Sequence, residues 1–424
     1  MRFSVCNLGC KVNSYEAQGV SALLEKKGWQ KVPFEQPADV SVIFTCAVTN
    51  TAAAKSRKMM HRVRRLNPEA VTVMVGCYTE VNDGLIEDAD IIAGTAYKKM
   101  VPALIDEYME TGRKIRMTGS LDNIKYDNLT ADTFDGRTRA YLKIQDGCNQ
   151  FCSYCVIPYA RGRERSMDFH DAVEQAKIIA RSYSEIVLTG IHTGRYGRGS
   201  GYHLADLMKQ ILKEADGLAR LRISSIEVTE VSDELISLMK EDTRVARHLH
   251  IPLQSGCNRI LKKMKRPYTT EEYLSRIEEI RRELPGVSIS TDLITGFPSE
   301  SEEDFMETYR FLQECAFSFL HVFPYSERTG TEAASMPEVV PPAVRKERTG
   351  RCMELSRRLL DEYMNQMTGR HAVIIPEETE EGYTKGSSSE YISVLVPGTY
   401  PHGVPLEVVL KEVKDHRMYG EVAL

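Results

Sequence analysis

The sequence predicts an α/β protein in three parts: an N-terminal parallel α/β sheet, a central (β/α) partial barrel and a small C-terminal all-β barrel. Two series of apolar runs alternate with amphipathic segments, and a polar stretch separates the two series. Short β-like runs separated by Gly, Pro and Ser make up the end of the chain. The length of 424 residues fits two to four domains.

Residues 1–118 are expected to form the first domain. Apolar runs predict strands at 3–8, 40–44, 71–75 and 91–93, and amphipathic segments predict helices at 15–26, 52–66 and 99–110. Asn13 or Ser14 is the expected N-cap of the first helix. The alternation of strand and helix favours a parallel sheet.

Residues 119–136 are polar with little periodicity and are expected to be a linker. The second domain, 137–367, is expected to have strands at 141–144, 186–189, 221–226, 248–253, 287–294 and 319–323. Helices are expected at 169–182, 204–215, 233–240, 270–284 and 302–315, followed by a long charged helix at 342–367. Ser301 and Asp304 are typical of a capping box. Six βα units favour a full or partial (β/α) barrel.

Residues 368–424 are expected to form the third domain. Their β-like runs lie at 372–375, 391–396, 406–413 and 417–422. Several short strands with turn residues between them are typical of a small barrel or sandwich.

Composition places limits on the function. The formal net charge is −5, which by itself counts mildly against a nucleic-acid-binding protein. The start of the chain lacks the pattern of a secretory signal, and no run approaches the roughly 18 apolar residues of a spanning helix. A cytoplasmic protein without a membrane partner is therefore expected. In that compartment the ten cysteines are expected to be ligands or core residues rather than disulfides.

The strongest chemical signal is a CxxxCxxC motif formed by Cys148, Cys152 and Cys155, directly after the first expected barrel strand. Thiolates are the ligands of iron–sulfur clusters, and three ligands leave one iron of a four-iron cluster open. Barrel active sites lie at the C-terminal ends of strands, where this motif stands. A tight zinc loop or incidental core cysteines are the alternatives, although zinc would prefer a fourth ligand nearby.

A second set of cysteines is scattered along the first domain. Cys10, Cys46 and Cys77 each follow the end of an expected parallel strand. Ligands of open α/β sheets bind outside the carboxyl ends of strands, so the three thiols could share one site. Three buried core cysteines are the alternative. Cys6, Cys257, Cys315 and Cys352 match no ligand position, and the last two are expected to pack on helices.

Residues 146–166 around the CxxxCxxC motif resemble radical S-adenosylmethionine enzymes. The segments GCKVNSYE (9–16), TCAVTN (45–50) and GCY (76–78) resemble the N-terminal domain of the methylthiotransferases within that superfamily. The resemblance covers essentially the whole chain, since the family also ends in a small β-barrel called TRAM. It implies that Cys148, Cys152 and Cys155 hold one 4Fe–4S cluster and that Cys10, Cys46 and Cys77 hold an auxiliary one.

The resemblance further implies the reaction. One S-adenosylmethionine donates a methyl group, a second is cleaved to a 5′-deoxyadenosyl radical, and a methylthio group is inserted at carbon 2 of an adenine in tRNA. Contacts with S-adenosylmethionine are expected at Tyr154, Thr189 or Gly190. Gln254 and Asp292 are expected to contact its ribose or adenine, or to hydrogen-bond each other. His192 is expected to be structural.

Two segments are candidates for contact with tRNA. The expected helix at 52–66 carries six cations that could engage phosphates, although a solvated face is the plain alternative: Lys55, Arg57, Lys58, Arg62, Arg64 and Arg65. The TRAM-like domain has nine acidic residues and five Lys or Arg, so it has no basic patch. Tyr391, Tyr400 and Tyr419 could stack on bases or pack internally.

Within the family, Val12 and Glu16 beside Cys10 resemble the branch that acts on N6-threonylcarbamoyladenosine next to the anticodon. Isopentenyladenosine in tRNA and an aspartate of a ribosomal protein are the alternative substrates. A non-catalytic iron–sulfur protein that binds RNA or carries electrons is the alternative of another class, but electron carriers usually close their clusters with four ligands. An electron donor such as a flavodoxin or ferredoxin is expected, and the oligomeric state is not indicated.

Overall fold

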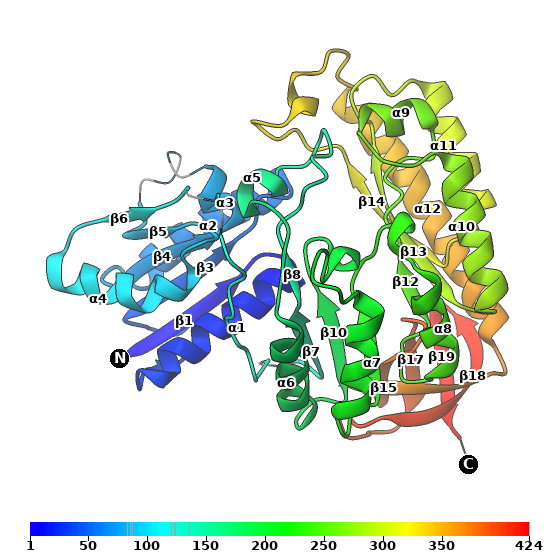
Figure 1. Cartoon of the computed structure of the whole chain (residues 1–424), viewed down its shortest axis with the longest axis horizontal. Coiled ribbons are helices and arrows are strands. Elements are labelled where there is room, and N and C mark those ends of the chain that lie inside the picture. The colour runs from blue at the N-terminus through cyan, green and yellow to red at the C-terminus, as the bar shows by residue number, and fades with distance from the viewer. Residues whose placement is uncertain are drawn as a thin grey trace.

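A computed structural model describes residues 1–82, 84, 86, 88–119, 121–122, 124–134 and 136–423. The N-terminal sheet, the central α/β region and the C-terminal β-barrel follow one another along the chain, and the C-terminal barrel lies against one end of the central region (Figure 1). This arrangement confirms the predicted fold class. None of the described helices is long and apolar enough to cross a membrane.

The N-terminal sheet has six parallel strands in the order β2-β1-β3-β4-β5-β6. They are β1 (Arg2–Asn7), β2 (Gln30–Lys31), β3 (Val40–Thr45), β4 (Val71–Gly76), β5 (Ile91–Ala93) and β6 (Ile115–Met117). Its helices are α1 (Lys11–Lys26), α2 (Asn50–Leu66), α3 (Cys77–Val81) and α4 (Val101–Thr111), with a 3-10 turn at Lys98–Met100. The expected strands and helices are confirmed, but the edge strands β2 and β6 escaped prediction because two or three residues show no period.

The first helix begins earlier than expected. Its N-cap is Cys10, not Asn13 or Ser14. The Asn13 amide instead donates to the Thr45 carbonyl at 2.8 Å, and the Ser14 hydroxyl accepts from the Asn7 amide at 2.6 Å. Because these tertiary hydrogen bonds engage the side chains of Asn13 and Ser14, neither side chain caps the helix, and the predicted N-cap was wrong.

The central region contains two three-stranded parallel sheets, β11-β10-β7 and β12-β13-β14. Backbone bonds from Leu221 to Arg244 and from Ile226 to His250 join them. The strands are β7 (Arg139–Lys143), β10 (Glu185–Thr189), β11 (Arg220–Ile223), β12 (His248–His250), β13 (Ser288–Thr295) and β14 (Phe319–Pro324). Within the described chain β7 and β14 do not pair, so the barrel is partial.

Helices cover the outside of this partial barrel: α6 (Phe169–Ala180), α7 (Leu204–Glu214), α8 (Asp233–Glu241), α10 (Thr270–Glu283), α11 (Glu302–Glu314) and α12 (Pro342–Met367). The capping box of Ser301 and Asp304 is confirmed at the start of α11. Short elements occupy the connections: β8 (Gln145–Asp146), α5 (Ile157–Arg161), β9 (Arg165–Ser166) and α9 (Asn258–Lys263), with 3-10 turns at Thr193–Arg195, Val228–Glu230 and Glu332–Ser335.

The C-terminal barrel is closed in the order β15-β16-β17-β19-β18. Its strands are β15 (His371–Glu380), β16 (Tyr383–Ser388), β17 (Ser393–Pro397), β18 (Leu406–Lys414) and β19 (Arg417–Val422). The sequence analysis missed β16, whose Lys385, Gly386 and Ser387 give no apolar alternation. Met364 and Met367 of α12 contribute to the barrel core, which ties the barrel to the preceding helix.

Two buried arginines fasten the C-terminal barrel to the N-terminal ends of the central strands. Arg220 donates to the carbonyls of Ser387 and Val373 at 2.9 and 2.6 Å, and Arg222 donates to those of Ser389 and Ser388. Glu185 pairs with both guanidinium groups. The barrel therefore closes the end of the central region that lies opposite the cysteine motif.

The segment expected to be a linker has no regular element in its described residues, but it is packed. Leu129, Ala131 and Phe134 are each at most 2% exposed. Leu129 belongs to the core of the N-terminal sheet, and Phe134 belongs to the core of the central region. This segment therefore holds the two parts together rather than separating them.

A network of fully buried charges also joins these two parts. Lys98 donates to Glu16 at 2.5 Å and Lys143 donates to the same carboxylate at 2.8 Å. Arg161 contacts both Glu16 and Asp146 at 3.0 Å. Glu16 and Lys98 come from the N-terminal part and the other three from the central region, so the ion pairs cross the boundary.

We expect Glu16→Gln to lower the free energy of unfolding by about 3–5 kcal/mol at pH 7, because it leaves buried cations uncompensated. Burial raises the pKa of Glu16, but Arg161, Lys143 and Lys98 outweigh burial and hold that pKa well below its ordinary value of 4.5. The stabilisation is therefore present above pH 4.5 and is lost as the pH falls below that value. Chemical denaturation over this pH range measures it.

The matched control is Glu25→Gln, an exposed position on the same helix. Its stability should stay within about 0.5 kcal/mol of the wild type. Equal stability of Glu16→Gln and wild type at pH 7 would contradict a stabilising role of the network.

Candidate active site between two sets of cysteines

The CxxxCxxC motif forms a tight loop after β8. The Cys148 amide donates to the Gly162 carbonyl at 3.1 Å, and the Cys155 amide donates to the Cys152 carbonyl at 2.9 Å. Gly147 has φ +71°, and a Cβ there would lie 2.0 Å from the Arg163 carbonyl oxygen, so only glycine fits. Burial, together with ionised Cys152 and Cys148, raises the pKa of Cys155 to about 12. The three thiols are thus close enough to affect one another.

Two cations lie beside these thiols. Arg266 contacts the Cys152 sulfur at 3.6 Å, and His192 Nδ1 lies 3.5 Å from the Cys148 sulfur. Burial lowers the pKa of His192, but Cys148 and Glu230 outweigh burial and raise it to about 10. Positive charge next to thiols favours the thiolate, which is the form that binds metal.

The second set of cysteines follows from the strand register. Thr45 of β3 pairs with Gly76 of β4, so Cys46 and Cys77 leave neighbouring strands side by side. Gly76 has φ +123°, and a Cβ there would lie 2.8 Å from the Thr45 carbonyl oxygen. Cys10 stands at the N-cap of α1, beside the end of β1. Burial raises the pKa of Cys77 to about 12; Arg161 lowers it, and ionised Cys10 and Cys46 raise it.

Among the described His, Cys, Asp and Glu side chains, no three are placed to hold one metal ion together. A four-iron cluster keeps its thiolates further apart than one zinc ion does, and it requires only thiolate ligands. The described residues thus offer no arranged three-ligand site for a single zinc ion, and the cluster at the CxxxCxxC loop stays a prediction.

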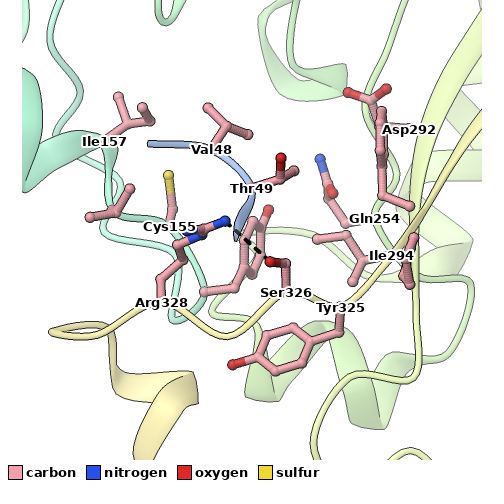
Figure 2. A pocket seen from close by; sticks show the side chains of 14 residues that line it. Val48, Thr49, Cys155, Ile157, Gln254, Asp292, Ile294, Tyr325, Ser326 and Arg328 are labelled. Carbon is pink, nitrogen blue, oxygen red and sulfur yellow. Dashed lines mark hydrogen bonds between the residues drawn. The ribbon is translucent and has the colours of Figure 1, made fainter. Parts of the chain in front are cut away.

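A cavity of about 270 Å³ lies beside Cys155 of the first set and the segment that follows Cys46 of the second (Figure 2). Val48 and Thr49, which follow Cys46, form one wall, and Tyr154 and Cys155 form another. The remaining lining comes from strand ends of the partial barrel and the segment after β14: Val156, Ile157, Gln254, Asp292, Ile294, Phe323, Pro324, Tyr325, Ser326 and Arg328. The largely apolar lining would exclude water from a bound molecule.

Only some of the residues expected to contact S-adenosylmethionine line this cavity. Tyr154, Gln254 and Asp292 line the cavity, whereas Thr189 and Gly190 do not. Thr189 is 2% exposed at the end of β10, and a Cβ on Gly190 would lie 2.9 Å from the Gln145 side chain. The contact at Thr189 or Gly190 therefore stays a prediction, and Gly190 has a packing role of its own.

Asp292 is held by a histidine rather than by Gln254. His250 Nε2 lies 3.2 Å from the Asp292 carboxylate. Gln254 adopts φ +70°, and its backbone amide donates to the Asp292 carbonyl at 2.9 Å. Both side chains therefore face the cavity from adjacent strand ends and remain available to a bound molecule (Figure 2).

Arg328 is a cavity residue that the sequence analysis missed. It is 9% exposed, and its guanidinium donates to Asn50 and Ser326 at 2.8 and 3.1 Å. Its buried Nε has no hydrogen-bond partner among the described residues. Burial lowers the pKa of Arg328, whereas an ionised Cys46 raises it, so the guanidinium lies near the auxiliary set as well. No local motif marks this arginine, because Asn50 and Cys46, which lie near its guanidinium, come from a segment far away in sequence.

The basic face of α2 is partly engaged within the protein. Arg64 pairs with Asp90 at 2.6 Å, and Arg62 lies 3.5 Å from Glu35. Arg57 donates to the Tyr78 hydroxyl at 2.7 Å. Lys55, Lys58 and Arg65 are exposed. Of the six cations, these three are therefore the freest to meet a phosphate.

Several residues left open by the sequence have packing roles. Tyr391 stacks on His248 with ring centroids 5.0 Å apart and lies under Arg222 at the base of the partial barrel, so it has a packing role, and its contact with RNA stays a prediction. Cys315, directly after α11, and Cys352 on α12 are fully buried in the core of the central region, which confirms them as packing residues.

Comparison with known proteins identifies the site. A family model for the radical SAM superfamily matches residues 142–312, and a model described as Uncharacterized protein family UPF0004 matches residues 2–94. The threonylcarbamoyladenosine tRNA methylthiotransferase MtaB of Bacillus subtilis (strain 168) is 43% identical, covering 92% of this chain and 89% of the relative. The chain belongs to the methylthiotransferase family of radical S-adenosylmethionine enzymes.

Other relatives support this membership. The MtaB of Aquifex aeolicus (strain VF5) is 38% identical, covering 89% of this chain and 93% of that protein. The tRNA-2-methylthio-N(6)-dimethylallyladenosine synthase of Moorella thermoacetica is 31% identical, with 93% and 92% covered. As a radical methylthiotransferase the chain is an enzyme that uses S-adenosylmethionine and a 4Fe–4S cluster.

A solved structure shares the fold. The radical S-adenosylmethionine methyltransferase TsrM from Kitasatospora setae matches with a TM-score of 0.58 at 14% identity, covering 91% of this chain and 80% of that one. This likeness concerns the fold alone.

We expect Arg328→Met to lower kcat/KM of this methylthiotransferase by about tenfold to a hundredfold, since a hydrogen bond to a charged group contributes roughly 1.5–3 kcal/mol. The buried Nε would otherwise donate to an acidic or carbonyl group of a bound molecule. Single-turnover assays of the reconstituted enzyme measure the effect. Arg357→Met, an exposed change on α12, is the control, and equal rates for both variants would contradict the role of Arg328.

Proposed function

We propose that this enzyme methylthiolates carbon 2 of N6-threonylcarbamoyladenosine next to the anticodon of tRNA. The observation that carries the proposal is one cavity lined both by Cys155 of the CxxxCxxC loop and by Val48 and Thr49, which follow Cys46. The MtaB relatives at 43% and 38% identity favour threonylcarbamoyladenosine over the dimethylallyladenosine substrate named for the relative at 31%.

In this proposal the two cysteine sets have separate tasks. Cys148, Cys152 and Cys155 hold the 4Fe–4S cluster, and Cys10, Cys46 and Cys77 hold a second, auxiliary cluster. When bound, the first supplies the electron that cleaves S-adenosylmethionine to a radical, and the second supplies the sulfur. A radical is required because an adenine C–H bond does not react by ordinary acid–base catalysis.

The protein itself binds, orients and shields the reactants. Tyr154, Gln254 and Asp292 are proposed to contact S-adenosylmethionine at the strand ends, with Thr189 or Gly190 as a further contact. The target adenine has to enter the cavity between Cys155 and Thr49, so it has to leave the stack of the anticodon loop. The apolar walls protect a radical from water and from side reactions.

The tRNA and the reductant approach from outside. Lys55, Lys58 and Arg65 are proposed to contact phosphates, with a weaker part for Arg57, Arg62 and Arg64, which already have internal partners. An electron donor such as a flavodoxin or ferredoxin is proposed to reduce the first cluster. The functional units are proposed as residues 1–118, 137–367 and 368–424, with 119–136 as the packed connection.

Mass spectrometry of tRNA nucleosides from cells that lack this gene tests the substrate. We expect the methylthio derivative of threonylcarbamoyladenosine to disappear and to return with the wild-type chain but not with Cys152→Ala. Loss of the isopentenyladenosine derivative instead would keep the enzyme class and overturn the substrate. Unchanged tRNA nucleosides would point to a protein substrate or a non-catalytic role.

A glycine substitution tests the auxiliary site. We expect Gly76→Ala to lower bound iron by about half, because its Cβ would collide with the Thr45 carbonyl and separate Cys46 from Cys77. Iron analysis after reconstitution measures the loss. Gly28→Ala is the matched control, since Gly28 also has positive φ but has open space around it. Full iron content in Gly76→Ala would contradict a cluster at this site.

A further inference from the structure

We infer that Arg161 is a positioning residue that links the two cluster-binding loops and raises the reduction potential of the auxiliary cluster. Its guanidinium comes from the helix that follows the CxxxCxxC loop and donates to the sulfur of Cys77, a ligand of the other set. The inference rests on the proposed function, since it requires a cluster at Cys10, Cys46 and Cys77.

The hydrogen bonds of Arg161 fix its position completely. Nε donates to the Cys77 sulfur at 3.2 Å. One terminal nitrogen donates to Glu16 and Asp146, both at 3.0 Å, and the other donates to Asn13 at 2.7 Å and to Glu16 at 3.0 Å. A guanidinium has five N–H donors, and these five bonds use them all. The side chain is fully buried, so no water competes for the sulfur.

The backbone around Arg161 is equally tied to the radical site. Arg161 ends α5, and the next residue, Gly162, accepts the backbone hydrogen bond of Cys148. The carbonyl of Ala160 accepts from the Thr95 hydroxyl of the N-terminal part at 2.6 Å. A shift of the CxxxCxxC loop would therefore move the Arg161 guanidinium against Cys77. For this reason the distance between the CxxxCxxC loop and the loop of Cys77 is fixed.

The charges around Arg161 point to an anion at the sulfur site. The network contains four cations (Lys98, Lys143, Arg161, Arg165) and two carboxylates (Glu16, Asp146), which leaves two positive charges in excess. Buried charge needs compensation, and thiolates on a cluster provide it. Positive charge and hydrogen bonds at the sulfur stabilise the reduced, more negative state of a cluster, so they raise its potential.

Arg165 provides a matched control within the same network. It donates to Asp146 at 3.0 Å and otherwise to the carbonyls of Arg161 and Arg163, and no contact with a cysteine is described for it. Arg165→Met thus removes an equal charge without removing a bond to sulfur. If the midpoint potential differs between Arg161→Met and Arg165→Met, the difference reports the hydrogen bond to Cys77 rather than the loss of a positive charge.

The test uses the full chain with Cys148, Cys152 and Cys155 changed to Ala, so that only the auxiliary site remains. After reconstitution with iron and sulfide, the midpoint potential is measured by redox titration followed by electron paramagnetic resonance. We expect Arg161→Met to shift the ratio of reduced to oxidised cluster at least tenfold toward the oxidised form, which is 59 mV for one electron. Arg165→Met should shift it less than half as far.

A second readout remains decisive if Arg161→Met cannot retain the cluster. Pulsed electron paramagnetic resonance of protein labelled with ¹⁵N-arginine should detect a guanidinium nitrogen coupled to the reduced cluster. We expect that coupling to be lost in Arg161→Lys and kept in Arg165→Lys. Loss in both, or no coupling in the parent protein, would overturn the inference.

The outcomes separate the two levels of the proposal. If the triple-alanine chain binds no cluster, the auxiliary site fails and the inference fails with it. If the cluster binds and Arg161→Met leaves its potential unchanged, or both arginine variants shift it equally, only the role of Arg161 is overturned.

Discussion

The structure depends on a buried ion network that crosses the boundary between the N-terminal sheet and the partial barrel. Burying Glu16, Lys98 and Arg161 is costly unless every charge finds a partner. Lys98 pairs with Glu16 on the same side of the boundary, whereas Arg161 and Lys143 pair with Glu16 across it. The two parts are therefore held in one relative orientation. That orientation places Cys155 of the central region and the segment after Cys46 of the N-terminal part on the lining of one cavity.

A second joint uses the same physical solution at the other end of the barrel. Glu185 forms ion pairs with Arg220 and Arg222, and both arginines also donate hydrogen bonds to backbone carbonyls of the C-terminal barrel. Arginine suits both joints because its planar fork binds several acceptors at once and stays charged when buried. The C-terminal barrel is fixed at the strand ends remote from the cavity. Any contact it makes with tRNA is thus made at a distance from the reacting base.

The cysteines of the N-terminal part show how a regular sheet can bring together residues that are far apart in sequence. Adjacent parallel strands in register deliver Cys46 and Cys77 to the same edge, and glycine before Cys77 permits the close approach of the two strand ends. Asn13 and Arg161 then occupy the space behind the sulfurs. The strand register therefore places the cysteines, and side-chain hydrogen bonds then hold the residues around them.

The sequence by itself determined the fold class, the principal strands and helices of the three parts, the CxxxCxxC motif of Cys148, Cys152 and Cys155, and the family. These features depend on local periodicity and on spacing within one loop, which a linear chain displays directly. Only the tertiary structure decided that Cys10 caps a helix, that the polar segment 119–136 is packed, that Arg328 lines the cavity and that Arg161 reaches Cys77. Each of these depends on partners brought together from distant segments, and a buried polar group takes whichever partner the fold provides, so no local pattern reveals it.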